Sequence, residues 1–128
     1  MRPYAWIAAI LLCTPVFTAR GNSHPGQPIL FRVQYGLASW YGEGSEGRRM
    51  ACGVPFNPYA MVAAHRTLPL GTRVEVTNLR NGISVVVRIM DRGPQIAGRI
   101  IDLSKGAADQ LRFTRQGLVR VRVRVLGN

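Results

Sequence analysis

The sequence predicts one small, mainly β domain in which short strands close into a barrel beside a short helix. Fourteen glycines and eight prolines in 128 residues favour turns and short strands over long helices. An unbroken alternation of valine and arginine over residues 119–125 predicts a strand with one buried and one solvated face. Such a strand needs partners on both edges, and closure of the sheet into a barrel provides them.

Residues 1–19 are typical of a secretory leader. Arg2 precedes an uncharged apolar run over residues 4–17, which is shorter than the roughly 20 residues that span a bilayer. We therefore expect a signal peptide, with an uncleaved membrane anchor and a buried core helix as the alternatives. Because Leu12 stands where lipid attachment to Cys13 would require a small residue, we expect an exported protein, soluble in the periplasm or cell wall rather than lipid-anchored.

A linker is expected over residues 20–34, since residues 21–28 are small, polar and repeatedly broken by proline. The folded domain is then expected to span residues 35–128. Within it, residues 36–42 and 60–64 are the weaker strand candidates.

The central part of the domain is predicted to be a β-hairpin. Residues 72–78 alternate with period two, and the apolar run over residues 84–90 is typical of a strand buried on more than one side. Between them, Asn81–Gly82 is a strong signal for a tight turn in which both central residues have positive φ.

One helix and one strand complete the domain. Ser104 can cap a short helix over residues 105–113, where apolar residues recur at helical spacing. The alternating strand over residues 119–125 follows, and its alternation divides side chains between the core and water. We expect burial of Val74, Val76, Val121, Val123 and Val125, and exposure of Arg120, Arg122 and Arg124.

Carboxylates are scarce in this chain, so their positions are informative. Asp91 ends the apolar strand at a tight turn, and Asp102 follows two isoleucines. Beside a hydrophobic wall, burial raises the pKa of a carboxyl group and can prepare it as a proton donor. The alternative is that both aspartates cap turns or a helix. Glu75 lies in mid-strand and is expected to form a surface ion pair.

Three further residues are candidates for the same site. His65 follows small apolar residues, where an imidazole is either a structural hydrogen-bonding group or a catalytic one. Trp40 and Tyr41 precede a glycine-rich loop and could stack on a sugar ring, although core packing is the equal alternative for Trp40.

The formal net charge of +11 comes from 17 basic residues, of which only Lys105 is a lysine, against 6 acidic ones. A basic face attracts polyanions, and export favours an acidic cell wall over nucleic acid as the partner. The sequence has no His and Cys cluster with metal-ligand spacing and no glycine-rich phosphate loop, so we expect neither a metal nor another cofactor.

Seven blocks of the domain carry a resemblance to a known family. They are Gly36–Gly42, Ala63–Thr72, Val76–Leu79, Asn81–Gly82, Val85–Arg88, Asp91–Pro94 and Arg99–Ser104. In this order they resemble the rare lipoprotein A family, bacterial endolytic peptidoglycan transglycosylases that are similar to the wall-loosening domain of expansins.

The resemblance implies a mainly β, six-stranded double-psi β-barrel with one or two short helices. It implies cleavage of the β-1,4 bond between MurNAc and GlcNAc, with closure of a 1,6-anhydro ring in place of attack by water. One carboxyl group can then act first as the acid and afterwards as the base. The residues carried over by position are Asp91, Asp102 and His65 as catalytic groups, and Trp40, Tyr41, Arg92 and Asn57 as glycan-binding groups.

The resemblance also implies partners. Family members act on glycan strands freed of stem peptides, often at the division septum, so peptidoglycan and septal division proteins are the expected partners. We expect a monomer that binds no nucleic acid and that contacts a membrane only through an uncleaved leader.

The loop after the first block departs from the family pattern. Where relatives usually read Thr-Ala-Asn-Gly-Glu-x-Phe-Asp, this chain reads Met50-Ala-Cys-Gly-Val-Pro-Phe-Asn57, so Val54 replaces a glutamate and Asn57 an aspartate. Two functions therefore stay open: a lytic transglycosylase, and a module that binds peptidoglycan without cleaving it, as expansins do. A third, a basic antimicrobial or nucleic-acid-binding barrel, rests on charge alone.

Overall fold

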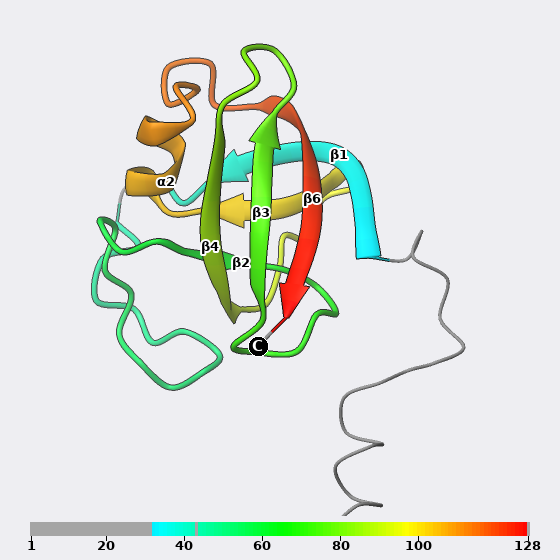
Figure 1. The fold of residues 1–128 in the computed structure, drawn as a ribbon. Coiled ribbons are helices and arrows are strands. Elements are labelled where there is room, and N and C mark those ends of the chain that lie inside the picture. The colour runs from blue at the N-terminus through cyan, green and yellow to red at the C-terminus, as the bar shows by residue number, and fades with distance from the viewer. Residues whose placement is uncertain (1–31, 43, 128) are drawn as a thin grey trace, which may run out of the picture.

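Six strands and one short helix make up the part of the chain that the computed structural model describes, residues 32–42 and 44–127 (Figure 1). The elements are β1 (Val33–Trp40), β2 (Val62–Ala64), β3 (Arg73–Asn78), β4 (Ser84–Asp91), β5 (Arg99–Leu103), α2 (Lys105–Gln110) and β6 (Val119–Gly127). The expected leader over residues 1–19 and most of the expected linker lie outside the described residues. The boundary expected between residues 34 and 35 falls within β1.

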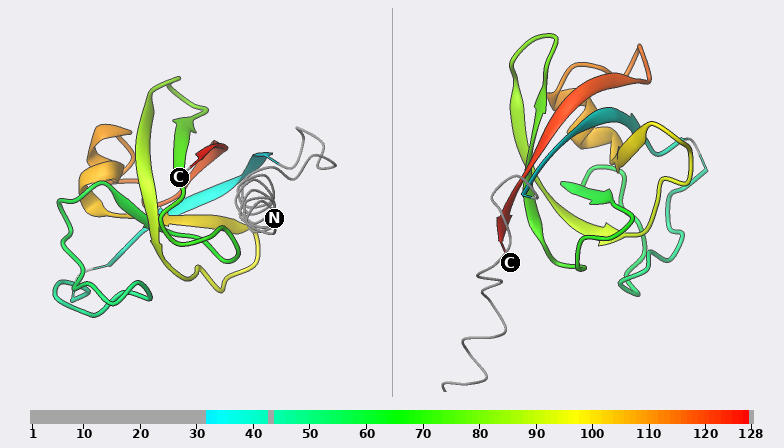
Figure 2. Two further views of the ribbon diagram at one scale, coloured as in Figure 1. Left: turned by 60° about the horizontal axis from the view of Figure 1, so that its bottom comes forward. Right: turned by 90° about the vertical axis from the view of Figure 1, so that its right-hand side faces the viewer.

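The strands close into a barrel in the order β1-β5-β2-β4-β3-β6. Two neighbouring pairs, β1–β5 and β2–β4, are parallel, and the other four are antiparallel. In Figure 1, β4, β3 and β6 form the front wall, and Figure 2 shows β1 and β6 running side by side. The expectation of a mainly β closed barrel with a short helix is therefore confirmed.

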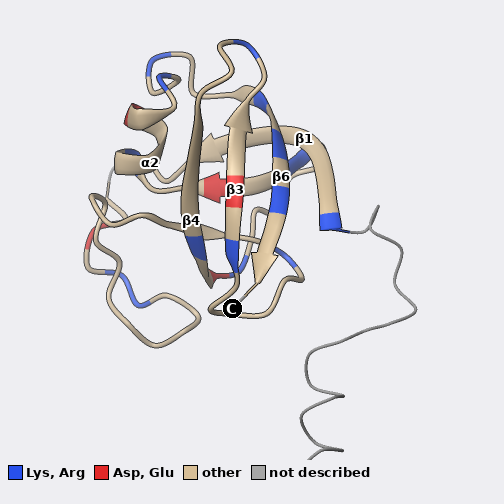
Figure 3. Cartoon of the chain, viewed as in Figure 1, with Lys and Arg blue, Asp and Glu red and all other residues tan. Residues whose placement is uncertain are grey.

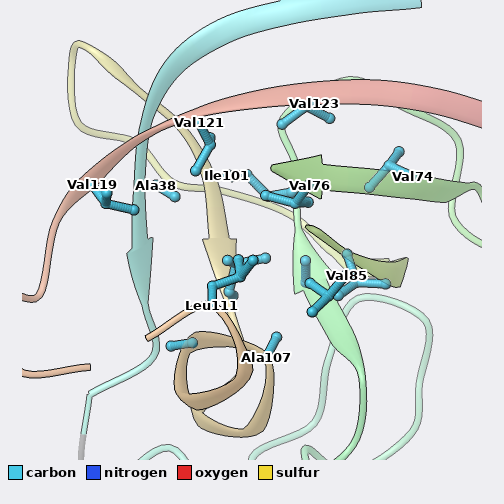
Figure 4. Packing of buried hydrophobic residues seen from close by; sticks show 14 of the residues in the cluster. Ala38, Val74, Val76, Val85, Ile101, Ala107, Leu111, Val119, Val121 and Val123 are labelled. Atoms are coloured by element: carbon cyan, nitrogen blue, oxygen red, sulfur yellow. The ribbon is translucent and has the colours of Figure 1, made fainter. Parts of the chain in front are cut away.

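The barrel interior is filled by the valine faces of its strands. Val74, Val76, Val121 and Val123 are at most 1% exposed, as expected, and Figure 4 shows them with Ile101, Leu111 and Ala107 in one apolar interior. Val125 is only partly buried because it lies near the end of β6, where the pairing with β3 changes register. Burying such side chains supplies the main favourable free energy of folding.

The outer face of β6 is basic. Figure 3 marks the basic positions along β6 and one acidic position on the neighbouring β3, which is Glu75. The carboxylate of Glu75 pairs with Arg124 at 3.1 Å and with Arg122 at 3.8 Å, as the sequence predicts. Arg120 and Arg124 are exposed, whereas Arg122 is half-buried because it lies between Tyr35 of β1 and Thr77 of β3.

The turn between β3 and β4 differs from the tight two-residue turn expected at Asn81–Gly82. Gly82 has a φ of 78°, but Asn81 is not among the described non-glycine residues with positive φ. The loop spans residues 79–83, and the Asn81 side chain holds it on two sides: its Oδ1 accepts from the Ile83 amide within the loop, and its Nδ2 donates to the Leu111 carbonyl. The carbonyl at the end of α2 therefore fixes this loop.

The helix is also shorter than expected. The Ser104 hydroxyl accepts a hydrogen bond from the Ala107 amide at 3.2 Å, which confirms the predicted N-cap. The helix ends at Gln110 instead of residue 113, because Arg112 adopts a positive φ of 61° that terminates the helical hydrogen-bond ladder.

Candidate active site

Asp91 and Asp102 come together because β2 lies between their strands. Ala64 of β2 pairs with Asp91 of β4 on one side and with Asp102 of β5 on the other. Neighbouring strands are about 4.8 Å apart, so the two Cα atoms lie roughly 10 Å apart. Both aspartates line one cavity of about 280 Å³. The expectation that they share a groove is confirmed; their catalytic roles remain a prediction.

Three donors hold the carboxylate of Asp91. The Tyr41 hydroxyl donates to Oδ2 at 2.8 Å, while the backbone amides of Ala51 and Arg92 donate to Oδ1 at 2.8 and 2.9 Å. The Arg92 amide directly follows β4, whereas the other two donors come from distant segments, so the loop that contains Ala51 and the residue after β1 both orient the group. The arrangement fixes Asp91 as a hydrogen-bond acceptor on the cavity wall.

Asp102 has a different environment. Its side chain accepts one hydrogen bond, from the Ser39 hydroxyl at 3.2 Å. Burial raises the pKa of Asp102 from its ordinary 3.8 to about 6, and the nearby Asp91 adds to the rise. The Ser39 bond and the charge of Arg99 act in the opposite direction and only partly offset the rise. Asp102 is therefore the described carboxyl group best prepared to carry a proton near neutral pH.

Tyr41 connects the loop to the aspartates. Its ring stacks on Phe56, with centroids 4.4 Å apart and an interplanar angle of 22°. Burial, followed by the hydrogen bond and charge of Asp91, raises the pKa of Tyr41, so its hydroxyl stays protonated and donates. Of the four predicted glycan-binding residues, Tyr41 and Arg92 line the cavity.

Cationic side chains border the same cavity. Arg92 donates through Nη1 to the carbonyls of His65 and Leu68, at 3.0 and 2.7 Å, which holds its guanidinium in place. Arg48 also lines the cavity and is exposed. The two aspartates therefore face a rim with two positive charges, where polar or anionic groups of a ligand could bind.

The backbone of His65 contacts Asp91, whereas its side chain is oriented toward another cavity, which His65 helps to line. Its amide donates to the Asp91 carbonyl at 3.1 Å. Its Nδ1 accepts from the amides of Thr67 and Leu68, both at 3.1 Å, so Nε2 carries the ring proton and donates to Gln34 Oε1 at 2.9 Å. Burial and the charges of two nearby arginines lower the pKa of His65, which keeps the imidazole neutral.

The other two predicted glycan-binding residues lie outside the aspartate cavity lining. The Trp40 indole packs against the core and donates to the Thr114 carbonyl at 3.2 Å. Of the two alternatives for Trp40, sugar stacking and core packing, the structure shows core packing. Asn57 is exposed and its Oδ1 accepts from the Tyr59 amide in a local turn. Val54, on the same loop, is 51% exposed.

Sequence reasoning missed several residues of this site. Ser39 is the hydrogen-bond donor to Asp102 because β1 pairs with β5 in a register that places the two residues opposite each other. Arg48 and Gln95 line the cavity from loops, without a local motif to mark them. Ser39 could have been identified from its position two residues before Tyr41 in the block Gly36–Gly42.

Neither a membrane-spanning helix nor a metal site is found in residues 32–42 and 44–127. None of the helices there is long and apolar enough to cross a membrane. No group of three or more His, Cys, Asp or Glu side chains within the same residues could hold a metal ion.

The barrel is closed and six-stranded, and the family that it matches identifies this class of domain as a double-psi β-barrel. Residues 33–123 match the family described as lytic transglycolase. The chain belongs to this family.

Curated relatives share close to half or more of the aligned residues. A probable endolytic peptidoglycan transglycosylase RlpA of Synechocystis sp. is 56% identical over 103 residues, which cover 80% of this chain and 32% of the relative. The endolytic peptidoglycan transglycosylase RlpA of Campylobacter jejuni is 50% identical over 112 residues, which cover 87% of this chain and 41% of the relative. The chain thus spans less than half the length of these relatives.

A solved structure shares the fold. An expansin of Clavibacter michiganensis superimposes with a TM-score of 0.59 at 23% identity, covering 75% of this chain and 51% of the expansin. At this identity the match describes the barrel alone.

Proposed function

We propose that this domain is an endolytic peptidoglycan transglycosylase that cleaves the MurNAc–GlcNAc β-1,4 bond and leaves a 1,6-anhydro-MurNAc end. The observation that carries the proposal is the pair of aspartates in one cavity, of which Asp102 has a pKa raised to about 6 by burial. The names of the RlpA relatives support the same reaction and substrate.

In the first step, the protonated Asp102 donates its proton to the glycosidic oxygen. The bond from that oxygen to the anomeric carbon of MurNAc breaks, and the GlcNAc unit leaves with a free 4-hydroxyl group. Positive charge develops at the anomeric carbon. The Asp91 carboxylate, oriented by its three donors, stabilises this charge.

In the second step, the ionised Asp102 acts as the base. It accepts the proton of the MurNAc 6-hydroxyl while that oxygen bonds to the anomeric carbon, which closes the anhydro ring and regenerates the acid. No water is consumed. Tyr41 and His65 act as positioning residues: Tyr41 through its hydroxyl on Asp91, and His65 through its amide on the Asp91 carbonyl.

The alternative is a module that binds glycan strands without cleaving them. It is favoured by Val54 and Asn57, which replace two carboxylates of the family pattern and leave the loop around Ala51 without a charge at either position. The same cavity would then grip the strand, and the barrel fold that it shares with an expansin is compatible with such a role.

The cellular setting is part of the proposal. An apolar run behind Arg2 supports export, after which the domain would act in the periplasm or cell wall on strands freed of stem peptides. Septal division proteins are the proposed recruiting partners, and the domain is proposed to act as a monomer.

The deciding experiment incubates the full chain with peptidoglycan, with and without stem peptides, followed by mass spectrometry for 1,6-anhydro ends. We expect these ends from the wild type, at a rate that rises as the pH is lowered from 8 through 6. Asp102→Asn and Asp91→Asn should each reduce the rate by about 10²–10⁴-fold. If the wild type binds the glycan and releases no anhydro ends, the binding module replaces the enzyme.

A further inference from the structure

A second cavity, of about 380 Å³, lies where β1 and β5 meet the loop that follows β2. The residues that line it are Gln34, Tyr35, His65, Arg66, Thr67 and Ile100. Tyr35 is 60% exposed, and Arg66 and Thr67 are exposed as well, so a ligand could enter from solvent. The proposed reaction uses none of these side chains at the reacting atoms.

The lining of this cavity offers hydrogen-bond donors, and none of its six residues carries a carboxylate. The Gln34 Oε1 atom accepts from His65 Nε2, which leaves the NH₂ group of the same amide as a donor. Arg66 contributes a guanidinium that is anchored by a 2.7 Å bond from Nη2 to the Arg99 carbonyl. A guanidinium pairs with a carboxylate through two parallel bonds, so a carboxylate is the group that suits this lining best.

An apolar surface lies beside these donors. Ile100 packs directly over Gly36, where an added Cβ atom would come within 2.7 Å of Ile100 Cγ2. Only glycine lets Ile100 lie this close to β1, and the ring of Tyr35 adds further apolar area. An apolar face next to a few polar groups is the combination that binds a sugar ring.

The strand β5 connects this cavity with the aspartate cavity. Ile100 and Asp102 flank the fully buried Ile101, so their side chains share the outer face of β5, about 7 Å apart. The Arg99 carbonyl that anchors Arg66 belongs to the same strand. A glycan that runs along β5 with one sugar at Asp102 would place a neighbouring sugar at Ile100.

We propose that the second cavity is a subsite for a MurNAc unit with a free lactyl carboxylate, and that Arg66 binds this carboxylate. The inference rests on the proposed function, since it places one more unit of the same glycan. A stem peptide converts the lactyl carboxylate into a neutral amide and removes the charge that pairs with Arg66. Arg66 is thus a specificity-determining residue for strands freed of stem peptides.

The test measures dissociation constants in an Asp102→Asn background, which slows cleavage enough for binding to be measured. Isothermal titration calorimetry uses a tetrasaccharide of alternating GlcNAc and MurNAc with free lactyl carboxylates, and the same tetrasaccharide with methylamides in their place. Arg66→Gln is compared with Arg88→Gln, a matched control, because Arg88 is also exposed and donates through Nη1 to a backbone carbonyl, that of Gly71, at 2.8 Å. Arg88 lines neither cavity.

We expect the parent to bind the free carboxylate form about tenfold more tightly than the methylamide, the effect of one partly exposed charge-assisted contact. Arg66→Gln should lose this preference, Arg66→Lys should keep part of it, and Arg88→Gln should keep all of it. If Arg66→Gln does not fold, the test uses the backbone amide chemical shifts of the Asp102→Asn parent instead. The amide shifts of Thr67 and Ile100 must then change when the free carboxylate form is added.

An unchanged preference in Arg66→Gln, or no response at Thr67 and Ile100, overturns the subsite. Anhydro ends from the wild type in that case leave the proposed function standing. If the preference for the free carboxylate form depends on Arg66 but the wild type releases no anhydro ends, the subsite is supported. Only the proposed enzymatic function is then refuted.

Discussion

Replacing Asp102 with asparagine should make the domain more stable at pH 7.5 while it removes activity. Burial raises the pKa of Asp102 from 3.8 to about 6, so above pH 6 the folded state carries a charge in an unfavourable place. Asparagine has nearly the same shape and keeps a carbonyl oxygen for the Ser39 hydroxyl. The substitution therefore removes the cost of the charge and little else.

The magnitude follows from the shift in pKa. If the pKa of Asp102 rises by about 2, the charged form is destabilised in the folded state by about 3 kcal/mol. Because the carboxyl group is only partly buried, screening by solvent lowers this figure, and we expect about 1–2 kcal/mol. The unfolded chain releases this proton at lower pH than the folded one, so the stability of the wild type falls as the pH rises from about 4 through 6. The asparagine variant lacks this dependence.

The assay is thermal unfolding at pH 4 and pH 7.5, alongside the release of anhydro ends. We expect a Tm gain of roughly 5–10 °C at pH 7.5 and none at pH 4. Asp109→Asn is the control, since hydrogen bonds from Thr114 and Lys105 lower the pKa of Asp109, and its replacement should give no gain. If Asp102→Asn and the wild type lose stability in parallel between pH 4 and 7.5, the reasoning about a buried acid is refuted.

Three further variants test the site. Tyr41→Phe removes the 2.8 Å bond to Asp91 and should lower kcat/KM for anhydro-end release about tenfold, with the fold intact by circular dichroism. His65→Ala leaves two backbone amides without their acceptor and should cost about 1–3 kcal/mol in urea unfolding; a loss of activity at full stability would instead indicate that the ring takes part in catalysis. Val54→Glu combined with Asn57→Asp restores the family carboxylates and should increase anhydro-end release; no increase would mean that the loop works without them.

The strand pattern could be predicted from the sequence wherever burial is decided along one strand. The valines of β3 and β6 alternate with polar residues, and each set lies on the face that period two assigns to it. The loop at Asn81–Gly82 could not be predicted in the same way. Its conformation depends on the Leu111 carbonyl, which lies 30 residues from Asn81 along the chain.

In the site, too, the features set by neighbouring residues could be predicted, whereas those set by contacts distant in sequence could not. Asp91 and Asp102 could be identified as candidates because each follows a run of apolar residues. Such a run predicts burial from the local sequence alone. Their meeting depends on a register shift between Ala63 and Ala64 of β2 in its pairing with β4, and the contact of Ser39 with Asp102 follows a second shift, between Leu37 and Ala38 of β1. Such irregularities redirect side chains and leave no periodic signal in a sequence. For the same reason the direction of the His65 ring could not be predicted.

The position of β6 sets the order in which the domain can fold. Of the strands in residues 32–42 and 44–127, β6 is the last in sequence, and it fills the space between β1, the first of them, and β3. A nascent chain that ends before residue 119 therefore has two open strand edges facing each other and no closed core. Strand pairing between the two ends of a chain is slow and exposes edges to aggregation meanwhile. The barrel can close only after the whole domain has been synthesised, and removal of the final strand is expected to yield aggregates in place of a smaller folded barrel.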